Sequence, residues 1–330
     1  MNILFIDITA YKPYSLDMVY NESLGGSEAT MLRIASGLAH SGHSCYLYQS
    51  IASEMDTQEI GGIAHIGMNS EFPAPDLVVH FRMPTDIKLW KSIYPDAKHI
   101  MWLQDLGGEW LKEHDYDQET PIVCTSKFHV LQVNNELRAL GLKAPSVKHV
   151  YNPVCVTYAG SSMPKIPARL GFFSSPHKGL IRTIEVFSKL RLKRPDLELV
   201  VGNPGYIQGI PEEEIEGVRF LGDLPHFRAM EELGQCAMLF YPQVNFPEAF
   251  GIVMGEANAL GVPVLAHRFG ASKEVCALSD RVIDCKDDDN VIDSAIELLG
   301  SNNPREIKEC FKIENVLKAW EGYLEETFVP

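Results

Sequence analysis

The sequence predicts an α/β protein with two doubly wound parallel sheets, and three observations support this fold class. Ten short apolar runs alternate with amphipathic stretches along the chain, a segment rich in Pro, Ser and Gly interrupts this alternation near its middle, and 330 residues are enough for two domains of roughly 100–200 residues each. Strand and helix in alternation are typical of parallel sheets that carry helices on both faces.

The predicted strands are continuous apolar runs, as expected where both faces of a sheet are buried. They lie at 2–8, 44–50, 75–81, 98–103 and 121–126, and then at 168–175, 197–202, 218–223, 237–242 and 262–267. Amphipathic helices are predicted at 27–40, 179–193, 226–235 and 251–260. Segment 151–168 has no periodicity and is the predicted linker. We therefore expect an N-terminal domain over 1–155 and a second domain over 165–315.

Composition excludes several classes of protein. The formal charge of −15 argues against wrapping nucleic acid, because phosphate binding needs clustered Lys and Arg. The seven cysteines are scattered and never spaced C-x-x-C, so neither a disulfide framework nor a zinc site is indicated. The N-terminus lacks the pattern of a signal peptide, and no run is long enough to span a membrane. We expect a cytoplasmic protein with at most peripheral membrane contact.

A glycine-rich turn follows the first predicted strand. In "LGGSEAT", Gly25 and Gly26 free the backbone for close approach, and Ser27 is a good N-cap for the next helix. Such a turn can hold a phosphate at a helix N-terminus, and it equally fits a simple loop and cap. No G-x-G-x-x-G follows this strand, which counts against a nicotinamide dehydrogenase.

A similar corner opens the second domain at "SSPHKG". Ser174, Ser175 and Pro176 follow a predicted strand, so Lys178 falls at a helix N-terminus. A lysine there opposes the helix dipole and costs a few tenths of a kcal/mol unless an anion is bound. The alternatives are a phosphate-binding lysine and a solvated surface lysine.

Two carboxylates stand in the apolar stretch "NFPEAFGIVMGEANALGVPV" at 245–264. Glu248 lies in the turn after a predicted strand, and Glu256 lies in the following helix, which ends at Gly261. Eight helical residues rise ~12 Å, so the two carboxylates could bind two parts of one long ligand. The alternative is a first-turn acid and an exposed helix residue.

Together these motifs resemble the retaining nucleotide-sugar glycosyltransferases of family 4, within glycosyl transferases group 1. The resemblance implies the GT-B fold, with two Rossmann-like domains facing a central cleft, and a donor held mainly by the second domain. It implies that Lys178 binds the diphosphate, Glu248 the sugar hydroxyls and Glu256 the ribose. The remaining donor contacts that it implies are Gly25, Gly26, Ser175, Asn203, Leu224, Ala249, Phe250, Gly251 and Ile252, with the base near Asn203 and Pro204.

The sequence departs from this family pattern at two places. Many relatives carry an arginine ahead of the lysine, where this chain has Ser174 and Ser175. Relatives also often present a histidine where this chain has Gln104 and Asp105. We expect Gln104 to hydrogen-bond the sugar or acceptor, and Asp105 either to accept a proton or to cap a loop. Arg82 could supply positive charge near the same cleft.

The acidic run "CKDDDN" at 285–290 contains Asp287-x-Asp289, a pattern that can bind a divalent metal. Because it precedes a helical pattern, we interpret it as a solvated, helix-initiating loop and expect no essential metal.

The C-terminal segment 316–330 is a predicted helix with a broad apolar face. The resemblance implies that it crosses back to the first domain, and a terminal helix packed on the second domain is the alternative.

The predicted function is retaining, hexosyl-type transfer from a nucleotide-diphosphate sugar, with UDP as the favoured nucleotide, to a glycan, lipid or small-molecule acceptor. The alternatives are a nucleotide-sugar epimerase and a catalytically silent binding protein.

Overall fold

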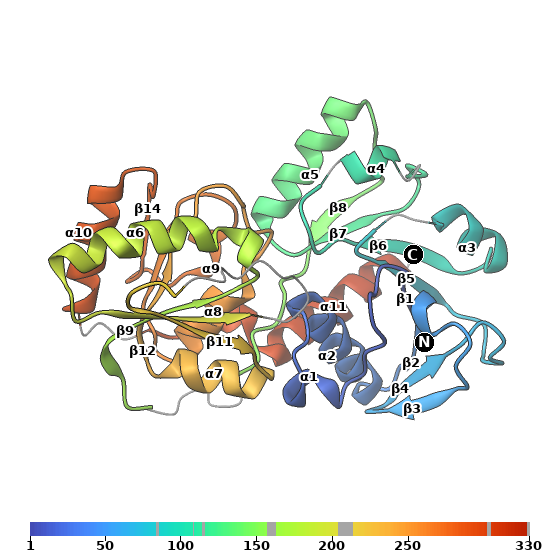
Figure 1. The fold of residues 1–330 in the computed structure, drawn as a ribbon. Helices are drawn as coiled ribbons and strands as arrows, with labels where there is room; N and C mark the ends of the chain where they lie inside the picture. Colours follow the sequence, from blue (N-terminus) through green and yellow to red (C-terminus); the bar gives the residue numbers. More distant parts are fainter. Residues whose placement is uncertain are drawn as a thin grey trace. The chain divides into compact units, whose positions relative to one another are not determined.

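The computed structural model describes residues 1–83, 86–107, 109–113, 116–156, 163–203, 214–301 and 305–328. Contacts divide the chain into two compact units, which Figure 1 shows as ribbons. The first unit comprises Met1–Asp17, Ser27–Asn152 and Glu314–Pro330, and the second comprises Met18–Gly26 and Pro153–Ile313. Within the described part of the chain, no helix combines the length and apolarity needed to cross a membrane.

The first unit is built on an eight-stranded sheet in the order β3-β4-β2-β1-β5-β6-β7-β8. All neighbouring strands are parallel except β3 and β4, which pair antiparallel. The strands are β1 (Asn2–Asp7), β2 (Ser44–Gln49), β3 (Gln58–Ile60), β4 (Ile63–Ile66), β5 (Leu77–Phe81), β6 (Lys98–Trp102), β7 (Ile122–Cys124) and β8 (Val147–His149). Its main helices are α2 (Gly26–His40), α3 (Ile87–Ile93), α4 (Glu109–Glu113) and α5 (Lys127–Leu140).

The second unit has a six-stranded parallel sheet in the order β11-β10-β9-β12-β13-β14. Its strands are β9 (Ile166–Phe173), β10 (Glu198–Asn203), β11 (Val218–Asp223), β12 (Cys236–Tyr241), β13 (Val264–His267) and β14 (Arg281–Ile283). Its helices include α1 (Met18–Asn21), α6 (Leu180–Lys193), α7 (His226–Gly234), α8 (Ile252–Ala259), α9 (Ser272–Val275) and α10 (Asp288–Leu299). In Figure 1, α6 and α10 lie on one face of this sheet and α7 on the other.

All ten predicted strands and all four predicted helices are confirmed. Most of those strands could be predicted because their side chains are buried, as in β5, where all five residues are buried. The strand β11 is an exception, since none of its six residues is buried. The strands that the sequence analysis did not predict in the first unit are short. Of these, β3 is an exposed edge strand, and β8 contains only one apolar residue.

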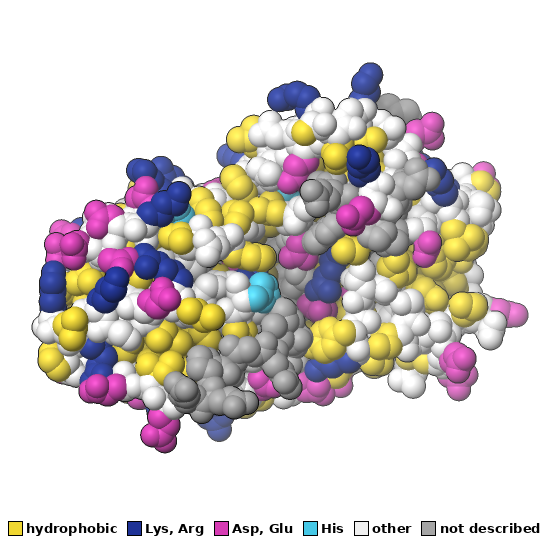
Figure 2. All heavy atoms as spheres, turned by 45° about the horizontal axis from the view of Figure 1, so that its top comes forward, with side chains coloured by type: hydrophobic (Ala, Val, Ile, Leu, Met, Phe, Trp, Pro, Cys, Tyr) yellow, Lys and Arg dark blue, Asp and Glu magenta, His cyan; other side chains and the backbone are white. Residues whose placement is uncertain are grey.

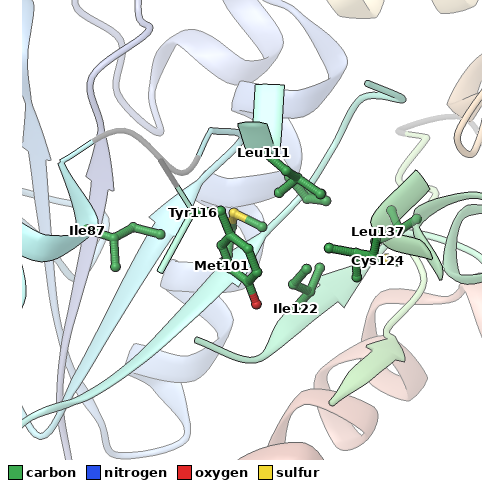
Figure 3. Packing of buried hydrophobic residues seen from close by; sticks show 9 residues of the cluster. Ile87, Met101, Leu111, Tyr116, Ile122, Cys124 and Leu137 are labelled. Carbon is green, nitrogen blue, oxygen red and sulfur yellow. The ribbon is translucent and has the colours of Figure 1, made fainter. Parts of the chain in front are cut away.

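A buried apolar cluster holds the β6–β7 end of the first sheet to its helices (Figure 3). Met101 of β6 and Ile122 and Cys124 of β7 pack against Leu111 of α4 and Leu137 of α5. Burial of one such side chain contributes about 1.5–3 kcal/mol. This packing fixes the carboxyl end of β6, after which Gln104 and Asp105 follow in the sequence.

The C-terminal helix α11 (Ile313–Phe328) belongs to the first unit from Glu314 onward. Its Trp320 packs edge-on against Trp102 of β6, with ring centroids 4.7 Å apart. A Cβ at Gly37 of α2 would stand 2.5 Å from Leu317, so a glycine there lets the two helices approach closely.

Charged side chains of both signs are interspersed over the surface of α6 and α10 (Figure 2). Lys193 pairs with Asp293 at 2.9 Å, and Lys189 pairs with Asp288 at 2.5 Å. Exposed pairs of this kind contribute little to stability. The face in view therefore carries no basic patch of the kind that would bind nucleic acid over these helices.

Two buried histidines of adjacent strands hydrogen-bond to each other inside the first unit. His80 Nε2 lies 3.0 Å from His99 Nδ1, and His99 Nε2 donates to the Tyr94 carbonyl at 3.2 Å. Burial and the neighbouring His99 lower the pKa of His80 to about 3, and burial also lowers the pKa of His99. Both rings are therefore neutral at pH 7.

This pair predicts that the first unit loses stability in mild acid. Unfolded histidines have a pKa near 6.5, so below that pH the unfolded chain binds more protons than the folded chain. For each extra proton that the unfolded chain binds, the free energy of unfolding falls by about 1.4 kcal/mol for every pH unit of acidification. Urea unfolding at pH 7 and pH 5 measures the loss through tryptophan fluorescence, since all four tryptophans fall within the ranges of the first unit. A His80→Phe variant should show a smaller pH dependence, and an unchanged dependence would contradict the assignment.

Candidate functional site

Lys178 and Glu248, which are 70 residues apart in the sequence, form the centre of a polar cluster in the second unit. Lys178 Nζ lies 3.2 Å from Oε1 and 2.9 Å from Oε2 of Glu248. The Tyr241 hydroxyl, at the end of β12, donates to Glu248 Oε1 at 2.8 Å. Because Glu248 is only 7% exposed, the lysine and the tyrosine offset the cost of burying its charge.

The turn after β9 presents the lysine. The backbone N–H of Lys178 donates to the Ser175 carbonyl at 2.9 Å. Gly179 follows with φ +93°, a backbone conformation that residues other than glycine rarely adopt. A Cβ at Gly179 would stand 2.2 Å from the Gln243 side chain. Ser175 is buried, and its hydroxyl has no hydrogen-bond partner among the described residues.

Gln243 shapes the loop that leads to Glu248. Its Nε2 donates to the Phe246 carbonyl at 2.6 Å, and its Oε1 accepts from the N–H groups of Asn245 and Phe246 at 3.1 and 2.9 Å. The loop thereby places the Phe246 ring with its centroid 4.8 Å from Lys178 Nζ, a cation–π distance. No local sequence motif marks Gln243.

Gly270 fixes the backbone of Glu248 from the loop after β13. A Cβ at Gly270, which has φ +61°, would stand 2.7 Å from both the N and O atoms of Glu248. The Ala271 N–H also donates to the Glu248 carbonyl at 3.0 Å. Sequence reasoning missed Gly270, because only the fold brings this loop against the Glu248 turn.

Gly270→Ala is expected to displace Glu248. The backbone must move to relieve the contact, so we expect a loss of about 1–3 kcal/mol in the free energy of unfolding and at least a tenfold loss of turnover. Gly261→Ala is the matched control, since Gly261 has φ +67° but nothing within 4 Å of its Cβ position. Urea unfolding and turnover measured for both variants separate the contact from backbone strain. Equal effects in the two variants would rule out the contact.

The helix α8 begins beside this cluster. Gly251 precedes it with φ +84°, and its Cβ position lies 3.3 Å from the Glu248 Cβ. Ala249 and Phe250 are buried, and Phe250 packs edge-on against Phe311 with centroids 5.1 Å apart. The Gly26 Cβ position lies 3.1 Å from Ile252, so the Gly25–Gly26 turn also reaches the start of α8 within the second unit.

Glu256 lies further along α8 and is 7% exposed. Its Oε1 accepts from Nε2 of His226, the first residue of α7, at 2.8 Å. Sequence reasoning missed His226, because a histidine at a helix start carries no motif. The site predicted for the base is described only in part: Asn203 is buried and Leu224 is half-buried, while Pro204 lies outside the described residues.

A buried polar network anchors the end of α8. Asn258 Nδ2 donates to Asp280 Oδ2 at 2.8 Å, and Arg305 Nε lies 3.5 Å from Asp280 Oδ1. The Val264 and Ala277 N–H groups donate to the same carboxylate at 2.9 and 3.0 Å. Burial nevertheless raises the pKa of Asp280, against these opposing contacts. Because the carboxylate is fully paired, the network can hold α8, and with it Glu256, in place.

The other predicted catalytic residues lie in the first unit. Gln104 is buried, and its Oε1 accepts from Asn152 Nδ2 at 2.8 Å. Asp105 is half-buried, with its backbone beside His129. Burial lowers the pKa of His129 to about 4, so this histidine is neutral at pH 7. The Gln104 amide is therefore hydrogen-bonded to Asn152 within the first unit, a contact that the sequence did not predict.

Arg82 is also engaged within the first unit. Its Nη2 lies 2.6 Å from Glu28 Oε2, and its backbone has φ +70°, in the left-handed region. Burial lowers the pKa of Arg82, but the carboxylates of Glu28 and Asp7 outweigh burial and raise it overall. The arginine charge, expected to serve a cleft, is thus compensated by Glu28.

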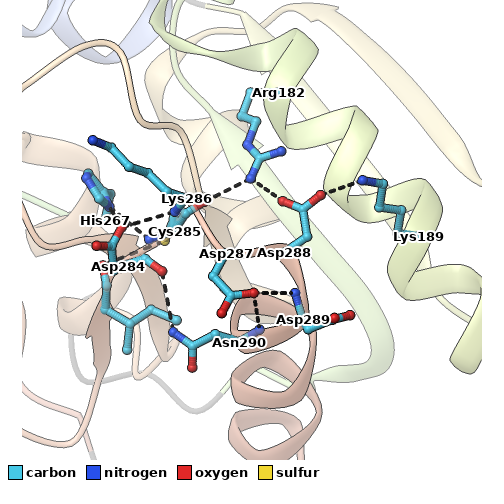
Figure 4. Close-up of polar contacts among 11 residues, drawn as sticks. Arg182, Lys189, His267, Asp284, Cys285, Lys286, Asp287, Asp288, Asp289 and Asn290 are labelled. Carbon is cyan, nitrogen blue, oxygen red and sulfur yellow. Dashed lines mark hydrogen bonds and ion pairs between the residues drawn. The ribbon is translucent and has the colours of Figure 1, made fainter.

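The acidic loop before α10 caps the helix, as the sequence predicted (Figure 4). Asp287 accepts from the N–H groups of Asp289 and Asn290 at 3.1 and 3.3 Å, and Asp288 pairs with Arg182 and Lys189. Among the residues that the structure describes, no group of three or more His, Cys, Asp or Glu side chains is arranged to hold a metal ion.

Comparison with known proteins finds a family whose model matches the part of the chain that carries this site. Residues 174–313, which contain Lys178, Glu248 and Glu256, match the family model of glycosyl transferases group 1. This part of the chain is similar to that family. Its curated relatives include a phosphatidyl-myo-inositol mannosyltransferase of Propionibacterium freudenreichii subsp. shermanii, 37% identical over 106 residues, which are 32% of this chain and 26% of that protein. The enzyme of the same name from Mycolicibacterium smegmatis is 28% identical over 141 residues, 41% of this chain and 36% of that protein.

The match thus spans between a quarter and about a third of the length of these relatives. Solved structures of similar fold include a sucrose-phosphate synthase from Thermosynechococcus elongatus, with a TM-score of 0.69, 15% identity and 99% of each chain covered. The Anabaena protein HepE in complex with UDP-glucose has a TM-score of 0.67 and 15% identity over 99% of this chain and 100% of that one. These similarities confirm the GT-B fold that the sequence predicted.

Proposed function

We propose that this protein is a retaining glycosyltransferase of group 1 that moves a sugar from a nucleotide-diphosphate sugar to a hydroxyl group of an acceptor. The observation that carries the proposal is the contact of Lys178 with Glu248, beside the turn into α8 that carries Glu256. A cation, a buried carboxylate and a second carboxylate further along the helix suit the three parts of one donor: diphosphate, sugar and ribose.

The donor would meet these residues in order. Lys178 binds the diphosphate together with the backbone of 249–252, and a phosphate oxygen would also give the buried Ser175 hydroxyl the hydrogen-bond partner that the described residues do not provide. Glu248 accepts from the sugar hydroxyls, and Glu256 accepts from the ribose. Asn203 and Leu224 lie towards the base, and Gly25 and Gly26 approach the phosphates.

The reaction breaks the bond between the anomeric carbon and the leaving phosphate oxygen and forms a bond from the acceptor oxygen on the same face. The acceptor proton passes to the leaving phosphate, so a protein base is not required. Lys178 stabilises the charge that develops on this phosphate, and such preorganised electrostatics is often the largest catalytic contribution. In this scheme Gln104 and Asp105 are expected to contact sugar or acceptor rather than to act as an essential base.

A thermal-shift screen tests the donor class. UDP, GDP, ADP and their sugar conjugates are added to the full chain, and a ligand at ~100 times its Kd adds about 2.7 kcal/mol to stability. UDP is the first candidate, because the similar fold of HepE was solved with UDP-glucose. Product analysis with glycan, lipid-polyol and small-molecule acceptors then determines whether the transferred sugar keeps the anomeric configuration of the donor, as the proposal expects. A free epimer formed without acceptor, or tight binding with neither transfer nor hydrolysis, would overturn the proposal.

Transfer is expected to proceed without a divalent metal. Lys178 supplies the positive charge at the diphosphate that a metal supplies in other transferases, and Asp287 is engaged as a helix cap. Initial rates with EDTA, and with added magnesium or manganese, should agree within about twofold. Abolition by EDTA and recovery with manganese would contradict this expectation.

A further inference from the structure

His226 holds the carboxylate of Glu256 from the neighbouring helix. Its Nε2 lies 2.8 Å from Glu256 Oε1, and the two side chains are 16% and 9% exposed. An ionised carboxylate only accepts hydrogen bonds, so the Nε2 atom carries the proton. His226 Nδ1 has no hydrogen-bond partner among the described residues. Within that part of the chain, the imidazole therefore forms its hydrogen bond through Nε2, to Glu256.

The imidazole is itself held on another side by the segment Met18–Gly26. The Tyr20 ring meets it edge-on, with centroids 6.2 Å apart, and the backbone N–H of His226 donates to the Glu22 carbonyl at 3.4 Å. This segment belongs to the second unit, although it precedes α2 in the sequence. The backbone contact fixes the start of α7, and the Tyr20 ring and Glu256 contact the imidazole itself.

We propose that His226 is a positioning residue that makes Glu256 selective for a ribonucleotide donor over its 2′-deoxy counterpart. The inference rests on the proposed function, in which Glu256 accepts from the ribose. Since Oε1 is committed to His226, the carboxylate cannot rotate freely, and Oε2 faces the ligand in one orientation. A fixed oxygen distinguishes a sugar with a 2′-hydroxyl from one without it, whereas a freely rotating carboxylate adapts to either.

Calorimetry on the full chain tests the proposal with two probes: the nucleoside diphosphate that binds the parent most tightly among UDP, GDP and ADP, and its 2′-deoxy form. His226→Phe keeps an aromatic ring beside Tyr20 and removes the hydrogen bond. We expect its affinity for the ribonucleotide to fall about tenfold, with less than a threefold change for the deoxynucleotide. The ratio of the two dissociation constants should therefore fall.

Two amide variants distinguish positioning from packing. The Nε2 atom of glutamine can take the place of the histidine Nε2, so His226→Gln should bring the ratio back to within about threefold of the parent. The amide of asparagine corresponds to Nδ1, which makes no such contact, so His226→Asn should behave like His226→Phe. Thermal unfolding of each variant verifies folding.

The outcomes separate this inference from the proposed function. If Glu256→Gln weakens the ribonucleotide but His226→Phe leaves the ratio unchanged, or Gln and Asn behave alike, the positioning role is wrong and the donor site stands. If the parent binds no nucleoside diphosphate, or Glu256→Gln binds it as well as the parent does, the donor site fails, and the inference fails with it.

Discussion

Glu248→Gln is expected to lower the transfer rate about a hundredfold or more, while the affinity for a free nucleoside diphosphate stays within about threefold of the parent. The substitution is nearly isosteric. A glutamine oxygen in the place of Oε1 can still accept from Tyr241 and Lys178, which lie 2.8 and 3.2 Å away. The fold should therefore survive, and the loss should fall on the sugar end of the donor.

The charge of Glu248 explains the split between rate and affinity. Sugar hydroxyls donate more strongly to a carboxylate than to an amide, and positive charge develops at the anomeric carbon as the leaving bond breaks. The free nucleotide lacks the sugar and does not sense this loss. Single-turnover transfer and calorimetry with the nucleoside diphosphate measure the two quantities on the same preparation.

Glu297→Gln provides the matched control. Glu297 pairs with Arg281 at 2.9 Å on the surface, with a side chain 67% exposed, and the substitution changes the net charge equally. It should leave both quantities at the parent values. A Glu248→Gln variant that loses only thermal stability, with turnover intact, would show that the carboxylate is structural.

The sequence predicted the parts of this fold whose signal is local. A buried parallel strand such as β12 is a continuous apolar run, and α8 has a glycine at its start and another after its end, so both could be read from neighbouring residues. The edge strand β3 could not, because its three residues are mostly exposed and carry no apolar pattern. Its pairing depends on β4, which the chain reaches through a tight turn at Gly61 and Gly62.

In the candidate site too, the residues with a local sequence signal could be predicted, and the contacts between distant segments could not. Lys178 and Glu248 were identified from separate motifs, but their contact depends on adjacent strands, β9 and β12, that lie far apart in the sequence. Gly270 and His226 carry no local signal, because each acts on a glutamate presented by a different segment. Gln104 was singled out for its position after a strand, and nothing near it in the sequence indicated Asn152 as its partner.

Lys178→Ala is expected to weaken nucleoside-diphosphate binding about tenfold to a hundredfold and to lower the transfer rate further. The ammonium group would bind the diphosphate in the ground state. It should act more strongly as negative charge grows on the leaving phosphate, so the effect on the rate should exceed the effect on binding. Calorimetry and single-turnover transfer measure both. Lys193→Ala is the control, since Lys193 forms a surface pair with Asp293 and should leave both unchanged.

The same substitution also leaves the carboxylate of Glu248, 7% exposed, without its cation, so part of its effect will be a loss of stability of about 1–3 kcal/mol. The double variant Lys178→Ala/Glu248→Gln separates the two effects, because a neutral glutamine needs no cation. We expect it to recover most of the lost stability in urea unfolding and yet to bind the diphosphate as weakly as Lys178→Ala does. If binding recovers together with stability, Lys178 supports the fold of the loop and does not hold the phosphates.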